Sequence, residues 1–292
     1  MHRSDFAGPW KAGGTLSDFL ARLPDILAGA DFKALSEAVV SAHKAGKPVV
    51  MGMGAHVIKV GLSPIVVDMM KRGILTAIAL NGAGIIHDVE VAMVGRTSED
   101  VQEGLEEGEF GMTKETADFL NQSIARAANT GTGLGVAVGA GIVDGDLPYA
   151  QDSIMAAAYR LGIPATVHVA IGTDVLHVHP RFDPGAVGEA SYRDFRLLAS
   201  VISDLEGGVY FNVGSAVILP EVFLKALTLV RNMGRKVKSF TTANLDFIRH
   251  YRPMTNVVTR PTSPGGRGYS LVGHHEIMLP LLAAAVIEKL GS

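Results

Sequence analysis

The stretch PVVMGMGAHVIKVGLSPIVVDMMKRGILTAIALNGAGIIHD, residues 48–88, predicts a strand–helix–strand unit. Two short apolar runs, 49–51 and 74–80, each stop at a glycine turn, as buried parallel strands do. Between the runs, Ser63 is the expected cap of a helix with Pro64 in its first turn. Both glycine turns therefore lie at the carboxyl ends of strands, where open parallel sheets bind ligands.

Strand and helix patterns alternate through the rest of the chain. This alternation predicts an α/β fold, a Rossmann-like, doubly wound and mostly parallel sheet with helices on both faces. The region 172–190 is expected to be a long loop followed by a helix that Ser191 caps. Further strands are expected at 135–138, 165–171, 208–214, 237–242 and near 257–258.

The length allows one large domain or two, and no linker divides the chain. The 292 residues contain no cysteine, so disulfides and thiolate chemistry are excluded, and any metal ligands must be His, Asp or Glu. A net charge of −3 with mixed signs indicates no nucleic-acid or membrane surface. Without a signal peptide or a spanning segment, we expect a cytoplasmic protein. Residues 1–14 are expected to form an N-terminal arm that packs on a neighbouring subunit, and residues 15–292 a single domain.

Polar residues follow successive predicted strands and should meet along one edge of the sheet. Turn amides and helix starts at such an edge bind nucleotides or similar anions, although either glycine turn alone could be a tight connection. Neither turn has the third glycine of the dinucleotide fingerprint. The candidate binding residues are Gly52, Gly54, His56, Lys59, Asn81, Gly82, Gly84, Gly214, Ser215, Thr242 and Ala243.

Four residues are candidates for catalysis: His87, Asp174, His177 and His274. His87 follows a glycine turn, where a neutral imidazole acts as acid or base or only caps the helix. His177 and His179 are two residues apart and could form a metal site with Asp174, His274 or His275, or be ordinary loop histidines. Because no helical histidine motif supports the metal site, no metal is assigned.

Several of these segments resemble the deoxyhypusine synthase family, in the same order along residues 48–290. The tripeptide Gly108-Glu109-Phe110 matches the tripeptide GEF in an acidic surface segment of that family. Thr241-Thr242-Ala243 resembles the family's turn of sequence NTA. The remaining matches are the segments MGMGAHVIKVG, LNGAGIIHD, LGIPATVHVAIGTD, GGVYFNVGSAVILPE and HHEIMLPLLAA.

The resemblance implies a Rossmann-like sheet that binds NAD, in a homotetramer with active sites at dimer interfaces. That family oxidises spermidine with NAD and passes an aminobutyl group through an imine on an enzyme lysine. Here Leu219 stands where that lysine falls, and an alkyl side chain forms no imine. The acidic residues after the second glycine turn are replaced by Ile86 and His87, and the aspartate before the last helix by His274.

We therefore expect an NAD-binding, transferase- or oxidoreductase-like enzyme that acts on a small substrate, such as an amine, without a covalent lysine intermediate. Two alternatives stay open. One is a metal-assisted hydrolase or lyase that uses histidines at the same sheet edge. The other is a nucleotide-binding protein without catalytic activity.

Overall fold

A parallel sheet of six strands forms the centre of the part of the chain that the computed structural model describes, residues 1–97 and 114–291. The strands are β1 (Val49–Met53), β2 (Ala77–Asn81), β3 (Ala165–His168), β4 (Val209–Val213), β5 (Thr241–Asp246) and β6 (Arg267–Val272). They lie in the order β3-β2-β1-β4-β5-β6, and all neighbours are parallel. The predicted Rossmann-like, doubly wound α/β fold is confirmed.

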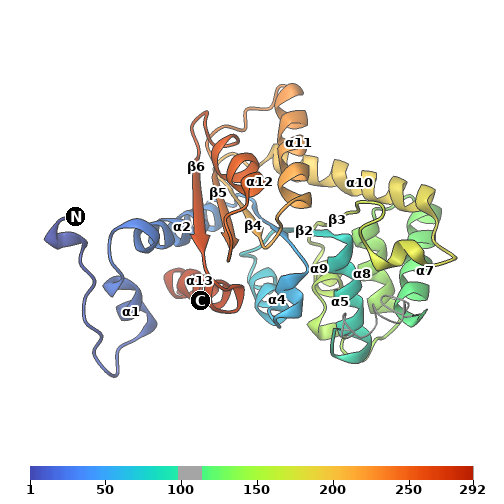
Figure 1. The fold of residues 1–292 in the computed structure, drawn as a ribbon, viewed down its shortest axis with the longest axis horizontal. Coiled ribbons are helices and arrows are strands. Elements are labelled where there is room, and N and C mark those ends of the chain that lie inside the picture. Colours follow the sequence, from blue (N-terminus) through green and yellow to red (C-terminus); the bar gives the residue numbers. More distant parts are fainter. Residues whose placement is uncertain (98–113, 292) are drawn as a thin grey trace.

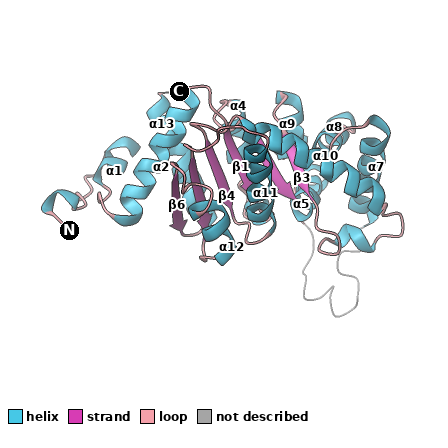
Figure 2. Cartoon of the chain, turned by 90° about the horizontal axis from the view of Figure 1, so that it is seen from above, coloured by secondary structure: helices cyan, strands magenta, loops and turns pink. Residues whose placement is uncertain are grey.

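Helices cover both faces of this sheet (Figures 1 and 2). One face carries α10 (Pro184–Ser203), α11 (Ile218–Asn232), α12 (Tyr251–Pro253) and the π-helical η4 (Met254–Thr259). The other face carries α2 (Leu27–Lys44), α4 (Ser63–Lys71), α5 (Gly82–Val94) and α13 (His275–Leu290), with α7 (Lys114–Thr130), α8 (Leu134–Asp144) and α9 (Ile154–Leu161) towards the β3 end. The short helices are η1 (Arg3–Asp5), α1 (Leu16–Arg22), α3 (His56–Lys59), η2 (Ala150–Asp152) and η3 (Val175–Val178). None of the helices in the described ranges combines the length and apolar composition that a bilayer-spanning segment requires.

The side chains of β1 explain why its sequence is apolar without alternation. Val49, Met51 and Met53 pack into the core beneath α2 and α4, whereas Val50 packs into a second core beneath α10 and α11. All four are fully buried. Because consecutive side chains of a strand point to opposite faces, a sheet with helices on both sides needs apolar residues at every position.

The strand expected at 135–138 is a helix, α8. Its glycines allow close packing rather than a turn. A Cβ at Gly135 would overlap the carbonyl oxygen of Ala165 in β3, and one at Gly139 would lie 2.6 Å from the Met155 oxygen of α9. Glycine at these positions lets α8 approach both backbones, a contact that local propensity cannot indicate.

The fifth strand lies about four residues later than predicted, at Thr241–Asp246 instead of 237–242. Its polar residues are paired inside the protein: Thr242 Oγ1 donates to Val257 O (2.8 Å) and Asn244 Oδ1 accepts from Asn212 Nδ2 (2.8 Å). The strand expected near Val257 is part of the π-helical η4, and β6 follows it. Tertiary hydrogen bonds therefore allow a strand that its polar sequence did not suggest.

Two helix starts also differ from the prediction. Helix α4 begins at Ser63 itself and has no side-chain cap, although Pro64 does lie in its first turn. Helix α10 begins at Pro184, capped by Asp183, whose side chain accepts from Ala186 N (3.0 Å). The loop after β3 is therefore shorter than expected, and Ser191 lies inside the helix. The tripeptide 108–110 lies outside the described residues.

The first residues of the chain extend past α2, beyond the β6 end of the sheet (Figures 1 and 2). Trp10 packs edge-on against Phe19 of α1, with ring centroids 6.1 Å apart, and Arg22 donates to Pro9 O (2.9 Å). Trp10 nevertheless remains 51% exposed. The division into an arm, 1–14, and one domain, 15–292, stays a prediction.

Two buried carboxyl groups tie the helices at the β3 end together. Asp88 of α5 accepts from Ser153 Oγ and from the N–H groups of Ile154 and Met155, which begin α9. Asp194 of α10 accepts from Gly135 N and Val167 N, both through Oδ2 (2.9 Å). Loss of water raises the pKa of Asp88 to about 6 and that of Asp194 to about 7, despite these donors.

Asp194→Asn tests whether the neutral acid is the form that fits this position. The folded pKa lies above the ordinary value of 3.8, so Asp194 stabilises the fold below about pH 4, and this contribution is lost as the pH rises through about 7. Asparagine keeps one acceptor oxygen and cannot ionise. Its stability relative to wild type, measured by urea unfolding, should therefore increase between pH 4.5 and 7.5.

Asp194→Ala is the matched control, because it removes the acceptor for both N–H groups. It should lose about 1–3 kcal/mol at either pH. Equal losses for the asparagine and alanine variants at both pH values would contradict the assignment.

Candidate functional site at the carboxyl edge of the sheet

The strand order reverses between β1 and β4, which are adjacent although far apart in sequence. The chain leaves β1 towards one face of the sheet, through α3 and α4, and leaves β4 towards the other face, through α11. Such a switch point is where doubly wound sheets bind ligands, because the loops diverge there. The candidate site is built around the turns after these two strands.

The two turns lie against each other. A Cβ at Gly54 would overlap the carbonyl oxygen of Gly214, and Gly214 has a φ of +65°, so both positions favour glycine. Beyond Gly214, the N–H groups of Ser215, Ala216 and Val217 have no acceptor within the described residues. N–H groups without acceptors just before the 15-residue helix α11 are the kind of donors that bind anions.

Four rings line the other side of these turns. His56 lies 5.6 Å from His275 and 5.9 Å from Phe247, between ring centroids, and His274 stacks on Phe247 at 6.3 Å. His56 and His274 are exposed, whereas His275 is buried against Gly214, where a Cβ would lie 2.8 Å from its ring. The two exposed imidazoles can exchange protons with a bound molecule.

The buried His275 has a defined tautomer. Its Nε2 lies 3.0 Å from the carbonyl oxygen of Leu245 and must carry the proton, because a carbonyl only accepts. Its Nδ1 is buried, with no partner within the described residues. The Nδ1 atom of His275 is therefore an acceptor beside the turn, and its ring packs edge-on against the ring of His56.

An amide network lies under the same turns. Asn212 donates to Ser215 O and to Asn244 Oδ1, both at 2.8 Å, and Ser215 Oγ accepts from Leu219 N at 3.2 Å. The Oδ1 atom of Asn212 is buried, and no group in the described ranges donates to it. This network holds the turn after β4 in place. It leaves Asn212 Oδ1 as a second buried acceptor near the turn, in addition to His275 Nδ1.

The second glycine turn, after β2, is already filled. Asn81 Oδ1 accepts from Gly84 N (3.0 Å), and the Asp174 carboxylate lies against Gly82. The His177 ring fixes this loop through contacts of 3.1 Å from Gly172 N and Asp174 N to Nδ1. Burial raises the pKa of Asp174, because its carboxyl loses water.

The two glycine turns differ in what they offer a pyrophosphate. At the start of α5, an added phosphate would meet the Asp174 carboxylate, and the Gly84 N–H already has Asn81 Oδ1 as its acceptor. After β4, the N–H groups of residues 215–217 have no acceptor within the described residues, and the exposed side chains of His56 and Lys59 lie on the adjoining helix α3. Of the groups in the described structure, those at the β1/β4 turns are the ones that could hold the phosphates of NAD.

The structure separates the predicted residues into groups. Gly54, His56, Gly214, Ser215 and His274 meet at the β1/β4 turns, and Lys59 lies on α3 beside them. Asn81, Gly82, Asp174 and His177 meet at the start of α5. His87 lies further along α5, where Nδ1 contacts Glu90 Oε2 at 2.8 Å.

Four predicted binding residues lie elsewhere. Thr242 and Ala243 are fully buried in the middle of β5, because the strand begins later than expected. Gly52 lies within β1, where a Cβ would overlap the Tyr210 hydroxyl, and Gly84 packs against Leu80 inside α5. We exclude these four from the candidate site.

The predicted set omitted His275, Phe247 and the amides of Ala216 and Val217. The pair His274-His275 was visible in the sequence, but only the helix start decides which imidazole is buried. His179 points to another part of the molecule, because its ring contacts Asn121 Nδ2 (3.1 Å). No three His, Asp or Glu side chains of the described ranges come together as a metal site would require.

Leu219 is fully buried, near the start of α11, in the core that α10 and α11 form on the sheet. Its side chain faces other apolar residues rather than the turn. The position where a lysine was sought by resemblance is therefore a core position in this chain.

Comparisons with known proteins bear on the fold. No known protein-family profile matches the chain, and no curated protein matches it. Solved structures do match: a candidate deoxyhypusine synthase from Entamoeba histolytica has 11% identity and a TM-score of 0.57, with 97% of this chain and 96% of that one covered. A conserved candidate LOR/SDH protein from Methanococcus maripaludis S2 has 17% identity and a TM-score of 0.56. That match covers 90% of this chain and 70% of the other protein.

AgrE, in a ternary complex with ornithine and NAD+, has 16% identity and a TM-score of 0.56. The match covers 91% of this chain but 34% of AgrE, so the chain spans about a third of that protein. At these identities the three comparisons establish a deoxyhypusine synthase-like fold.

Gly54→Ala tests the close approach of the two turns. The new methyl group would overlap the Gly214 carbonyl oxygen, a backbone atom that cannot move aside, so we expect a loss of about 1–3 kcal/mol in urea unfolding. Gly188→Ala in α10 is the control, because a Cβ there meets nothing within 4 Å. It should be neutral or gain up to about 1 kcal/mol. Equal stability of the two variants would refute the close approach.

Proposed function

We propose that this protein is an NAD-dependent enzyme of the deoxyhypusine synthase-like fold that acts on a small substrate without a covalent lysine. The observation that carries the proposal is the pair of facing turns at the β1/β4 switch point, after which the N–H groups of Ser215, Ala216 and Val217 lack acceptors within the described residues. His56 and Lys59 add positive charge or donors on one side. This arrangement suits the phosphates of a dinucleotide.

The NAD-associated structural neighbours support the same proposal. NAD, when bound, supplies hydride chemistry. The protein's own residues would bind the phosphates at the turns and place the exposed imidazoles of His56 and His274 near the reacting group, where either holds or accepts a proton. Asp174 and His177 remain candidates for orienting a substrate, with an amine as the first class to test. The metal-assisted alternative has no comparable observation in its favour.

Isothermal titration with NAD tests the proposal. Wild-type protein should bind NAD, and Lys59→Gln should bind it about 5- to 30-fold more weakly, which corresponds to about 1–2 kcal/mol of a charge-assisted contact. Lys71→Gln is the matched control, because Lys71 is an exposed lysine at the far end of α4.

Absence of binding by folded wild-type protein would refute the cofactor assignment. Equal affinities of the two lysine variants would place the phosphates elsewhere. If NAD binds but His274→Gln leaves every measured turnover unchanged, His274 has no catalytic role.

Exposed apolar side chains surround the candidate site and suggest a partner subunit. They follow four different strands at the same sheet edge: Ile171 (59% exposed), Val217 (49%), Ile248 (51%), Val272 (52%) and Ile277 (65%). Apolar residues gathered around a polar centre mark interaction surfaces. Together with the resemblance, they support a homotetramer whose sites lie at dimer interfaces.

Ile277→Lys should weaken this association at least tenfold, as measured by native mass spectrometry over a concentration series, because it buries an unpaired charge in the interface. Met233→Lys is the control, since Met233 is 73% exposed after the last turn of α11, at the opposite edge of the sheet. A wild-type protein that stays monomeric at micromolar concentration would refute the tetramer.

A further inference from the structure

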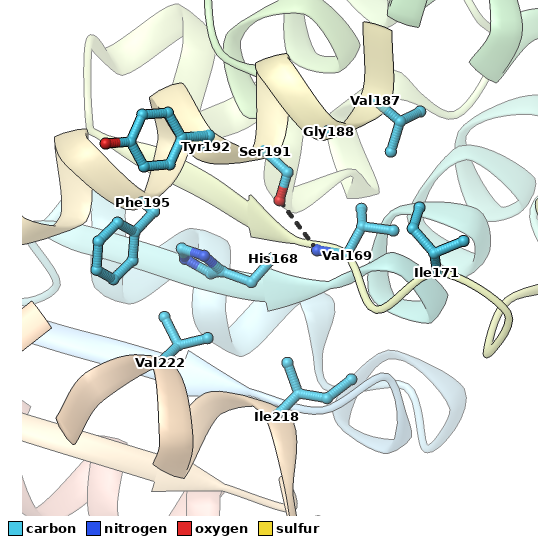
Figure 3. Close-up of a pocket in the computed structure, with 10 residues that line it drawn as sticks. All are labelled: His168, Val169, Ile171, Val187, Gly188, Ser191, Tyr192, Phe195, Ile218 and Val222. Atoms are coloured by element: carbon cyan, nitrogen blue, oxygen red, sulfur yellow. Dashed lines mark hydrogen bonds between the residues drawn. The ribbon is translucent and has the colours of Figure 1, made fainter. Parts of the chain in front are cut away.

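A separate hollow of about 250 Å³ opens between α10, α11 and the end of β3 (Figure 3). It lies on the α10/α11 side of the sheet and contains neither the His56–His275 ring cluster nor Asp174. Most of its wall is apolar. The lining residues are His168, Val169, Ile171, Val187, Gly188, Ser191, Tyr192, Phe195, Ile218 and Val222.

His168 is the polar group with an open position in this hollow. It is the last residue of β3 and only 4% exposed, and Figure 3 shows its ring between the α10 and α11 side chains. Ser191, in contrast, is satisfied: its Oγ donates to Val167 O (2.8 Å) and accepts from Val169 N (3.1 Å). Recognition of a polar group would therefore depend on His168.

The hydrogen bonds of His168 define what it can recognise. We assign the hydroxyl proton of Thr166 to its contact with Ile78 O (3.4 Å), which makes the imidazole Nε2–H the donor in the 3.0 Å contact with Thr166 Oγ1. The other ring nitrogen, Nδ1, then accepts, and it has no partner in the described part of the chain. Burial lowers the pKa of His168 to about 4, so the ring is neutral at physiological pH.

The size and charge of the hollow restrict the ligand further. A closed cavity of roughly 150 Å³ accommodates benzene, so 250 Å³ admits one ring or a branched chain but not a dinucleotide. None of the ten lining residues is charged at neutral pH. An ionised ligand would therefore lose its water without gaining a partner. Tyr192 and Phe195 stack at the hollow, with ring centroids 6.4 Å apart, and offer an aromatic surface.

We propose that this hollow binds a small, uncharged, mainly apolar molecule, such as a single aromatic ring, whose one hydroxyl or N–H group donates to Nδ1 of His168. The site is independent of NAD binding at the β1/β4 turns. It adds a second ligand position next to the loop that carries Asp174.

Phenol is the probe, with toluene as the isostere that lacks the donor and benzoate as the charged analogue. Binding is followed by long-range 1H–15N NMR of protein labelled at histidine, in which His168→Gln identifies the His168 signals. Phenol should shift the Nδ1 signal of His168 in a saturable manner and bind about tenfold or more tightly than toluene. Benzoate should not bind.

Gly188→Leu provides a test that leaves His168 intact. Gly188 lies on the same face of α10 as Tyr192 and Phe195, four and seven residues before them. A Cβ at Gly188 meets nothing within 4 Å. A leucine there is therefore expected to extend into the hollow. It should weaken phenol binding at least tenfold while the protein stays folded. If His168→Gln fails to fold, the signal that phenol shifts in wild type and not in Gly188→Leu identifies His168.

Three results would overturn the proposal: phenol that leaves every histidine signal unchanged at millimolar concentration, toluene that binds as tightly as phenol, or a folded Gly188→Leu protein that binds phenol like wild type. Unchanged phenol affinity in the presence of NAD is expected. Competition between the two would show that the hollow belongs to the nucleotide site and would also overturn the proposal.

Discussion

The close contact between the turns after β1 and β4 is the constraint on which the site depends. The two strands pair in parallel from Val49 with Val209 to Met53 with Val213, so their ends must meet. No side chain fits between Gly54 and the Gly214 oxygen. The chain then diverges to opposite faces of the sheet, and the N–H groups of residues 215–217, after Gly214, are left without acceptors among the described residues. The backbone alone thus creates a candidate anion site, with histidines of two segments, His56 of α3 and His274-His275 at the start of α13, beside it.

Glycines and backbone N–H groups also determine the packing at the β3 end of the sheet. Glycines bring α8 against β3 and α9, and the carboxyl groups of Asp88 and Asp194 accept from backbone N–H groups at the starts of α9 and α8 and in β3. Burial of both carboxyl groups favours their protonated forms. Charged or polar residues in this core therefore have structural roles, which distinguishes them from the exposed histidines at the carboxyl edge.

The filled turn after β2 changes what the resemblance implies. In this chain, Asn81 accepts from Gly84 N and the Asp174 carboxylate lies against Gly82, so a phosphate there would be repelled by a carboxylate. The open turn lies on the neighbouring strand pair. Leu219 belongs to the apolar core rather than to the site. A deoxyhypusine synthase-like fold is thus combined with a candidate site made of imidazoles, side-chain amides and backbone N–H groups.

The sequence by itself determined the fold class, the glycine turns and most helices, because hydrophobic period, glycine and proline act locally. It also indicated that Gly54, His56, Gly214 and Ser215 belong together, since parallel strands end at one edge. Only the tertiary structure decided that β5 includes Thr242 and Asn244, that residues 135–138 are helical and that His275 rather than His274 is buried. In each of these cases the deciding contact is a hydrogen bond or a close backbone approach to a residue distant in sequence, and local propensity contains no information about such contacts.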